Sequence, residues 1–96
     1  LINTLSIMAS LNITITNQLG LHARAAAKLT QLASQFKSEI HIARGDRRVN
    51  AKSIMGVMML AAGCGVTVTL DAEGEDAELA LEALAALFAN KFDEEQ

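Results

Sequence analysis

Hydrophobic and polar positions follow two different periods along the chain, and their order predicts seven elements. Apolar and polar residues alternate over 11–16, 39–44 and 66–70, as in half-buried β-strands. A Gly-Asp turn after the second of these predicts that residues 47–51 return as a fourth strand. Apolar residues spaced three or four apart predict one helix after residue 22, a short one from about 53 to 60, and a last one after 74–76.

The expected apolar faces of the long helices define much of the core. The first helix presents Ala26, Leu29, Ala33 and Phe36, and the last presents Ala77, Leu81, Leu84 and Phe88. In the strand over 39–44, Ile40 and Ile42 are expected to face inward, and His41 to be exposed. The order β-α-β-β-α-β-α favours an α+β open-faced sandwich, in which three helices cover one face of a four-stranded antiparallel sheet.

The length of the chain limits where chemistry can occur. Ninety-six residues make one small domain, which buries about 60 to 65% of the surface that its unfolded chain exposes. That is enough for a modest core and not for an enclosed cleft, so chemistry is expected on the surface. Residues 1–8 are interpreted as a leader with Met8 as the natural start, and residues 9–96 as the folded domain.

The junction between the first strand and the first helix carries unusual residues for a helix start. Helices usually begin with Ser, Thr, Asp or Asn and carry an acid in the first turn, because the first N–H groups are unpaired. Here the predicted cap is His22, and the first turn holds Arg24 and no carboxylate. A phosphoryl group on His22 would meet free N–H donors and the Arg24 guanidinium. A lone histidine beside a glycine is more often a surface or capping residue, but the flanking strand and helix favour the phosphoryl site.

Charge and composition exclude several classes of function. The net charge of −3 argues against nucleic acid as the main partner. Residues 22–52 hold seven bases and two acids, whereas 71–96 hold nine acids and one base, so an acidic protein could be steered onto the basic half. One cysteine and two histidines exclude a disulfide and a metal cluster. No apolar run reaches the ~18 residues of a membrane span and no secretion signal is evident, so a cytoplasmic protein with no membrane contact is expected.

Two separated stretches resemble the signatures of one family. Residues 17–24 (NQLGLHAR) and 50–60 (NAKSIMGVMML), with the AEGED entry to the last helix, resemble HPr, the histidine-containing phosphocarrier of the bacterial phosphotransferase system. The resemblance covers about residues 10–92. It implies a carrier rather than an enzyme, with no cofactor. His22 would take a phosphoryl group from enzyme I and pass it to an EIIA-type protein, and Arg24 would stabilise the phosphate.

One position departs from the family pattern. Ala25 stands where the family usually has proline, which suits the first turn of a helix because its φ is fixed and the missing N–H has no helical partner. We therefore expect a less rigid helix start. Restoring proline is expected to stabilise the fold by at most ~1 kcal/mol.

The second stretch carries the regulatory and docking predictions. Ser53 is expected to cap the short helix, and the resemblance implies that HPr kinase/phosphorylase phosphorylates it. Ile54, Met55, Val57, Met58 and Met59 cannot all face inward on so short a helix, so the surplus predicts a Met-rich docking surface. The predicted partner-docking residues are Ala23, Lys28, Lys52, Ile54, Met55 and Met58.

Alternatives remain open at this point. A nitrogen-branch (NPr-type) regulatory phosphocarrier shares the motifs, and the acidic residues near 93–95 suit either branch. A non-catalytic interaction domain would explain the apolar surface but not the start of the helix at His22. An RNA-binding sheet would need exposed aromatic residues for stacking, and the chain has three phenylalanines and no other aromatic. Nothing in the sequence requires more than a monomer.

Overall fold

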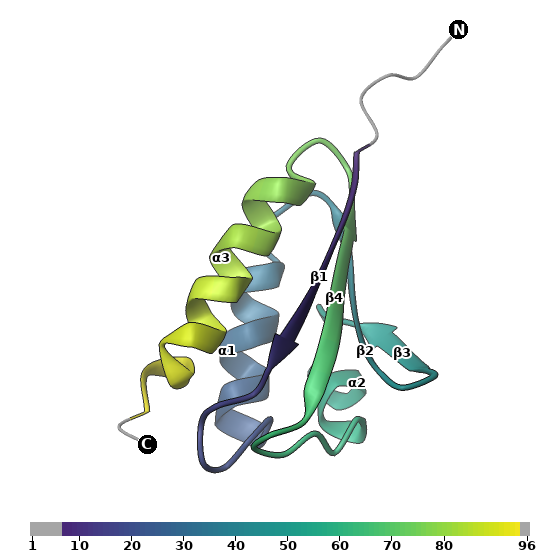
Figure 1. The fold of residues 1–96 in the computed structure, drawn as a ribbon. Coiled ribbons are helices and arrows are strands. Elements are labelled where there is room, and N and C mark those ends of the chain that lie inside the picture. The colour runs from purple at the N-terminus through teal and green to yellow at the C-terminus, as the bar shows by residue number, and fades with distance from the viewer. Residues whose placement is uncertain (1–6, 95–96) are drawn as a thin grey trace, which may run out of the picture.

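A four-stranded antiparallel sheet forms one layer of the molecule, and the helices form the other (Figure 1). The structure, a computed structural model, describes residues 7–94. The strands are β1 (Met8–Thr14), β2 (Glu39–Arg44), β3 (Arg47–Asn50) and β4 (Thr67–Glu73), in the spatial order β1-β4-β2-β3. The helices are α1 (Ala23–Ala33), α2 (Ile54–Met59) and α3 (Ala77–Ala89), followed by the 3-10 turn η1 (Lys91–Asp93). The predicted fold class is confirmed.

The predicted bounds of the first and last strands, β1 and β4, need correction. β1 covers Met8–Thr14 rather than 11–16, and β4 continues to Glu73 rather than ending at residue 70. Their pairing explains both shifts, because Met8 lies opposite Glu73 and the register runs without interruption to Thr14 opposite Thr67. The strand predicted over 66–70 ends before Asp71, which belongs to β4. Asp71 lies on the polar outer face, where a charge is tolerated. Residues 1–6 of the predicted leader lie outside the described residues, so the leader stays a prediction.

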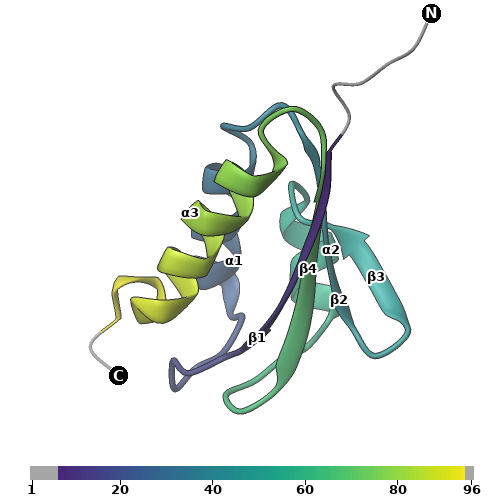
Figure 2. The same cartoon turned by 45° about the horizontal axis from the view of Figure 1, so that its top comes forward.

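The predicted apolar faces of α1 and α3 are buried, with one exception. Ala26, Leu29 and Ala33 of α1, and Ala77, Leu81, Leu84 and Phe88 of α3, belong to the core. Phe36 lies beyond the end of α1 and is half-buried. In Figures 1 and 2, α1 and α3 lie side by side along the sheet, and their axes run in opposite directions. The start of α1 is therefore at the end of the molecule where α3 finishes.

The outer face of the sheet is polar and cross-linked by side chains. Thr69 Oγ1 donates to Asn12 Oδ1 at 2.8 Å, and Arg48 Nη2 donates to Asp71 Oδ1 at 2.7 Å. His41 is half-buried rather than exposed as expected, and its Nδ1 lies 3.8 Å from Asp71 Oδ1. The predicted outward direction of His41 is correct, and its cross-strand neighbour Asp71 reduces its exposure.

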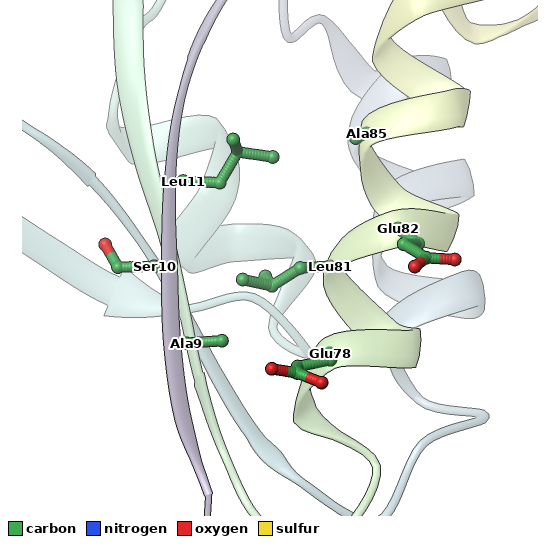
Figure 3. A pocket seen from close by; sticks show the side chains of 7 residues that line it. All are labelled: Ala9, Ser10, Leu11, Glu78, Leu81, Glu82 and Ala85. Atoms are coloured by element: carbon green, nitrogen blue, oxygen red, sulfur yellow. The ribbon is translucent and has the colours of Figure 1, made fainter.

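A shallow groove separates the edge strand β1 from α3 (Figure 3). Leu11 and Leu81 point toward each other across it, and Glu78 and Glu82 lie on the α3 side.

Within residues 7–94, no helix is long and apolar enough to cross a bilayer. The same range contains no group of three or more His, Cys, Asp or Glu side chains arranged to hold a metal ion.

Candidate functional site

The link between β1 and α1 is a tight turn built around a buried asparagine. Gly20 N donates to Asn17 O at 3.1 Å, and Asn17 Nδ2 donates back to Gly20 O at 2.8 Å. The Asn17 side chain is fully buried, and its Oδ1 has no hydrogen-bond partner among the described residues. Two reciprocal bonds thus fix the path of the backbone that delivers His22 to the start of α1.

Gly20 is required by its conformation and by its neighbours. Its φ is +66°, in the left-handed region that glycine tolerates best. A Cβ there would lie 2.6 Å from Gly63 Cα and 2.7 Å from Ala62 O. Leu21 N also donates to Ala62 O at 2.9 Å. The loop before β4, which contains Ala62 and Gly63, therefore packs directly against the turn that precedes His22.

His22 is the N-cap of α1, as predicted, but its side chain does not cap the helix. Its backbone is extended (φ −73°, ψ 179°), and its carbonyl accepts the first helical bond from Ala26 N at 2.8 Å. The N–H groups of Ala23, Arg24 and Ala25 therefore have no acceptor within the helix. The first turn contains no acid. This helix start concentrates unpaired donors and positive dipole charge beside an imidazole that is partly accessible to solvent.

Arg24 is exposed, and its guanidinium makes no hydrogen bond or ion pair with any residue in the range 7–94. Its positive charge acts on Glu94 and helps to lower the pKa of that carboxyl group. The neighbouring Ala25 is fully buried. A proline ring at that position would lose no helical hydrogen bond, although it would add atoms to a packed site.

Glu94 is a site residue that the sequence reasoning missed. One carboxylate oxygen, Oε2, contacts His22 Nε2, and the other, Oε1, accepts from Asn17 Nδ2 at 3.2 Å. The hydrogen bond from His22 lowers the pKa of Glu94 below its usual value, and the Asn17 bond and the Arg24 charge act in the same direction. His22 and Glu94 are separated by 72 positions, so no local spacing in the sequence could have linked them.

The exposed face of α2 carries the predicted docking side chains. Ser53 is the N-cap, and its Oγ accepts from Gly56 N at 3.1 Å, as predicted for its structural role. Val57 is the only buried residue of this helix. The exposed large side chains on it are Ile54, Met55, Met58 and Met59. The expected surplus of apolar residues is therefore on the surface.

Both lysines predicted to dock partners have partners within the fold. Lys28 Nζ donates to Phe92 O at 3.0 Å and lies 3.2 Å from Asp93 Oδ2. Lys52 Nζ donates to Phe36 O at 2.8 Å, just past the end of α1. Lys52 therefore contacts the segment that follows α1, whereas His22 is at the start of this 11-residue helix, which is about 16 Å long. Of the predicted docking residues, Ala23 lies beside His22 on the surface.

Two arginines of the basic half stabilise the other end of α2. Arg44 Nη1 donates to Leu60 O at 3.1 Å and to Ala61 O at 2.7 Å, and Arg47 Nη1 donates to Met59 O at 2.8 Å. These carbonyls end a helix and have no helical donor. The local positive charge counted in the sequence is therefore partly used in the fold itself.

Comparisons with known proteins agree with this architecture. The family model described as "PTS HPr component phosphorylation site" matches residues 9–90. The phosphocarrier protein HPr of Cupriavidus necator is 63% identical over 81 residues, which are 84% of this chain and 91% of that protein. The phosphocarrier protein NPr of Shewanella violacea is 52% identical over 82 residues, 85% of this chain and 90% of that protein. The crystal structure of HPr-C-His from Thermoanaerobacter tengcongensis has a TM-score of 0.89 at 48% identity and covers 92% of this chain and 99% of that one.

The fold and these relatives place the molecule in the class of small protein carriers rather than catalysts. The chain belongs to the HPr family, the phosphocarrier proteins of the phosphotransferase system. Its relatives include HPr and NPr proteins.

The close approach at Gly20 leads to a prediction with an internal control. Gly20 and Gly45 have similar φ values, +66° and +61°, but a Cβ at Gly45 would meet nothing within 4 Å. We expect Gly45→Ala to lower the free energy of unfolding by about 1 kcal/mol, the cost of a left-handed alanine. Gly20→Ala adds an overlap with backbone and should cost about 2 to 4 kcal/mol. Urea unfolding followed by circular dichroism measures both, and equal losses would contradict the close approach.

Proposed function

We propose that His22 is the residue of this phosphocarrier that accepts a phosphoryl group from enzyme I and passes it to an EIIA-type protein. The observation that carries the proposal is the uncapped start of α1 beside the His22 imidazole. Three unpaired N–H groups and the positive end of the helix dipole form an anion site there. The side chain of His22 is 27% exposed, so a partner protein reaches it directly.

The residue types suit a reversible transfer of phosphoryl groups. Neutral imidazole is a competent nucleophile near neutral pH, and a phosphoimidazole is a reactive donor. Phosphoryl transfer depends mainly on positioning and on charge stabilisation, which carrier and partner can share. The Arg24 guanidinium makes no hydrogen bond or ion pair among residues 7–94, so it is available to form two hydrogen bonds with phosphate oxygens.

The same proposal assigns the docking surface to the start of α1 and the exposed face of α2. Ala23, Ile54, Met55 and Met58 are exposed there, and flexible methionines adapt to differently shaped partners. Lys28 and Lys52 contribute positive charge around this surface. Their ammonium groups also donate hydrogen bonds to backbone carbonyls of the fold. We also propose that the protein acts in the cytoplasm as a monomer, because enzyme I and an EIIA-type protein must both reach His22.

Ser53 is proposed as the regulatory site of HPr kinase/phosphorylase. Its hydroxyl caps α2 and is half-buried, and phosphorylation would add about −1.5 to −2 charges beside the exposed methionines. A partner that buries this face would have to desolvate that charge, so the effect falls on recognition rather than on folding.

His22→Ala is expected to abolish phosphorylation in a mixture of enzyme I and radiolabelled phosphoenolpyruvate. In the wild-type protein the label should be acid-labile and base-stable, as expected for a phosphoramidate. His41→Ala removes the only other histidine and should accept label at the wild-type rate. Label on the His22→Ala protein, or label that survives mild acid, would exclude His22. Supplying the EIIA-type proteins of the sugar and nitrogen branches separately then distinguishes HPr from NPr activity.

Arg24→Ala should leave the fold unchanged and slow the transfer of phosphate. Losing a charged, two-bond contact worth about 1.5 to 3 kcal/mol corresponds to a rate about tenfold to hundredfold lower. Lys37→Ala is the matched control, because Lys37 is an exposed base whose side chain makes no hydrogen bond or ion pair with any described residue. Rapid-quench measurements of both variants with enzyme I test the role, and equal rates for the two would remove Arg24 from the site.

Ser53→Asp, a partial mimic of phosphoserine, should retain the wild-type circular dichroism spectrum and accept phosphate from enzyme I more slowly. The loss should be largest at low ionic strength, where charge repulsion is least screened. Ser10→Asp places the same charge on the exposed edge strand β1 and should have no effect on the rate. If authentic phosphoserine at residue 53 leaves the rate unchanged, Ser53 is a helix cap alone.

A further inference from the structure

The contact between Glu94 and His22 is not explained by the anion site at the start of α1. Glu94 comes from the far end of the chain, and its carboxylate lies against the ring nitrogen Nε2 of His22. The side chain is 15% exposed, less than that of His22. A carboxylate beside a proposed phosphate site is unexpected, because two anions repel each other. A second role must account for its place.

The segment before Glu94 is strained and firmly attached. Lys91, Phe92 and Asp93 have φ values of 56°, 55° and 65°, three successive left-handed residues without a glycine. Each costs about 1 kcal/mol or more, and such backbone persists only where its surroundings hold it. Phe92 is fully buried, and its ring centroid lies 4.8 Å from that of Phe88.

Polar contacts attach the same turn to α1. Lys28 Nζ donates to Phe92 O at 3.0 Å and to Asp93 Oδ2 at 3.2 Å. Lys28 is on α1, the helix that His22 begins, so the turn and the imidazole are held on one rigid element. Glu94 therefore reaches His22 from a fixed position.

The chemistry of the two groups determines which ring nitrogen carries the proton. The pKa of Glu94 is lowered, first by the hydrogen bond from His22 and then by that from Asn17, so the carboxylate is ionised at neutral pH. An ionised carboxylate only accepts hydrogen bonds. Nε2 must then be the donor in this contact, and in the neutral imidazole the lone pair is on Nδ1.

We infer that Glu94 is a positioning residue for phosphoryl transfer, which holds the His22 ring through Nε2–H and leaves Nδ1 as the nucleophile. The inference rests on the proposed role of His22. In the step, the Nδ1 lone pair forms the bond to phosphorus, and the bond between phosphorus and the donor breaks with its electron pair leaving on the donor. The proton stays on Nε2, where Glu94 stabilises the positive charge that develops on the ring. An aspartate that orients a catalytic histidine uses the same physics.

The substitution Glu94→Gln tests the inference because two donors converge on this side chain. His22 Nε2–H and Asn17 Nδ2 each need an acceptor, and a glutamine has one oxygen acceptor instead of two. We expect a mixture of His22 tautomers in long-range proton–nitrogen NMR spectra recorded on the neutral ring, for which the wild-type protein should show the Nε2–H form. Phosphorylation by enzyme I should slow by about tenfold to hundredfold, as when a partner that orients a histidine ring is lost.

Glu82→Gln is the matched control, since Glu82 is an exposed acid on α3 that changes the net charge by the same amount. It should change neither readout. An unchanged His22 tautomer in the Glu94→Gln protein would overturn the inference, and so would an equal or faster rate of phosphorylation, which would make Glu94 an obstacle to the phosphoryl group. If wild-type His22 accepts no phosphate, the proposed function fails, whereas the NMR measurement still decides whether Glu94 sets the tautomer.

Discussion

The packing of Gly20 against Gly63 is the constraint on which the site depends. Two backbones approach there more closely than any side chain would allow, and this approach joins the turn before α1 to the loop before β4. Since β4 pairs with both β1 and β2, the position of His22 is set by the centre of the sheet. His22 is thus partly exposed to solvent and still attached, through this loop, to the interior strand β4.

The site combines groups that would be unfavourable in an ordinary helix start. α1 begins without a side-chain cap and without an acid in its first turn, which leaves donors unpaired. The burial of Ala25, Ala26 and Leu29 compensates for this deficit. Stability comes from the core side of the helix, and the first N–H groups of the helix are left without helical acceptors. Local rules of stability often fail at functional sites for this reason.

Sequence patterns predicted the order of the elements and the position of His22 at the start of α1, and they missed the contacts between residues that are distant in the sequence. The β2 bounds and the caps His22 and Ser53 follow from alternation and helix-start rules that act over a few residues. Glu94 could not be predicted, because left-handed backbone at Phe92 and its neighbours has no signature without glycine. Their conformation depends on two tertiary features, the burial of Phe92 and the hydrogen bond from Lys28 to Phe92 O. The two residues joined by that bond are 64 positions apart in the sequence.

The short helix α2 has a consequence for motion. Within α2 only Val57 is buried, and two arginines bind the carbonyls at its end, whereas α1 and α3 bury four and five side chains in the same core. Such a segment opens locally at a lower free energy than the domain unfolds, so its amides should exchange with solvent first. The segment that carries the exposed methionines is therefore expected to open more easily than α1 or α3, so one face of the helical layer changes shape while the others keep theirs.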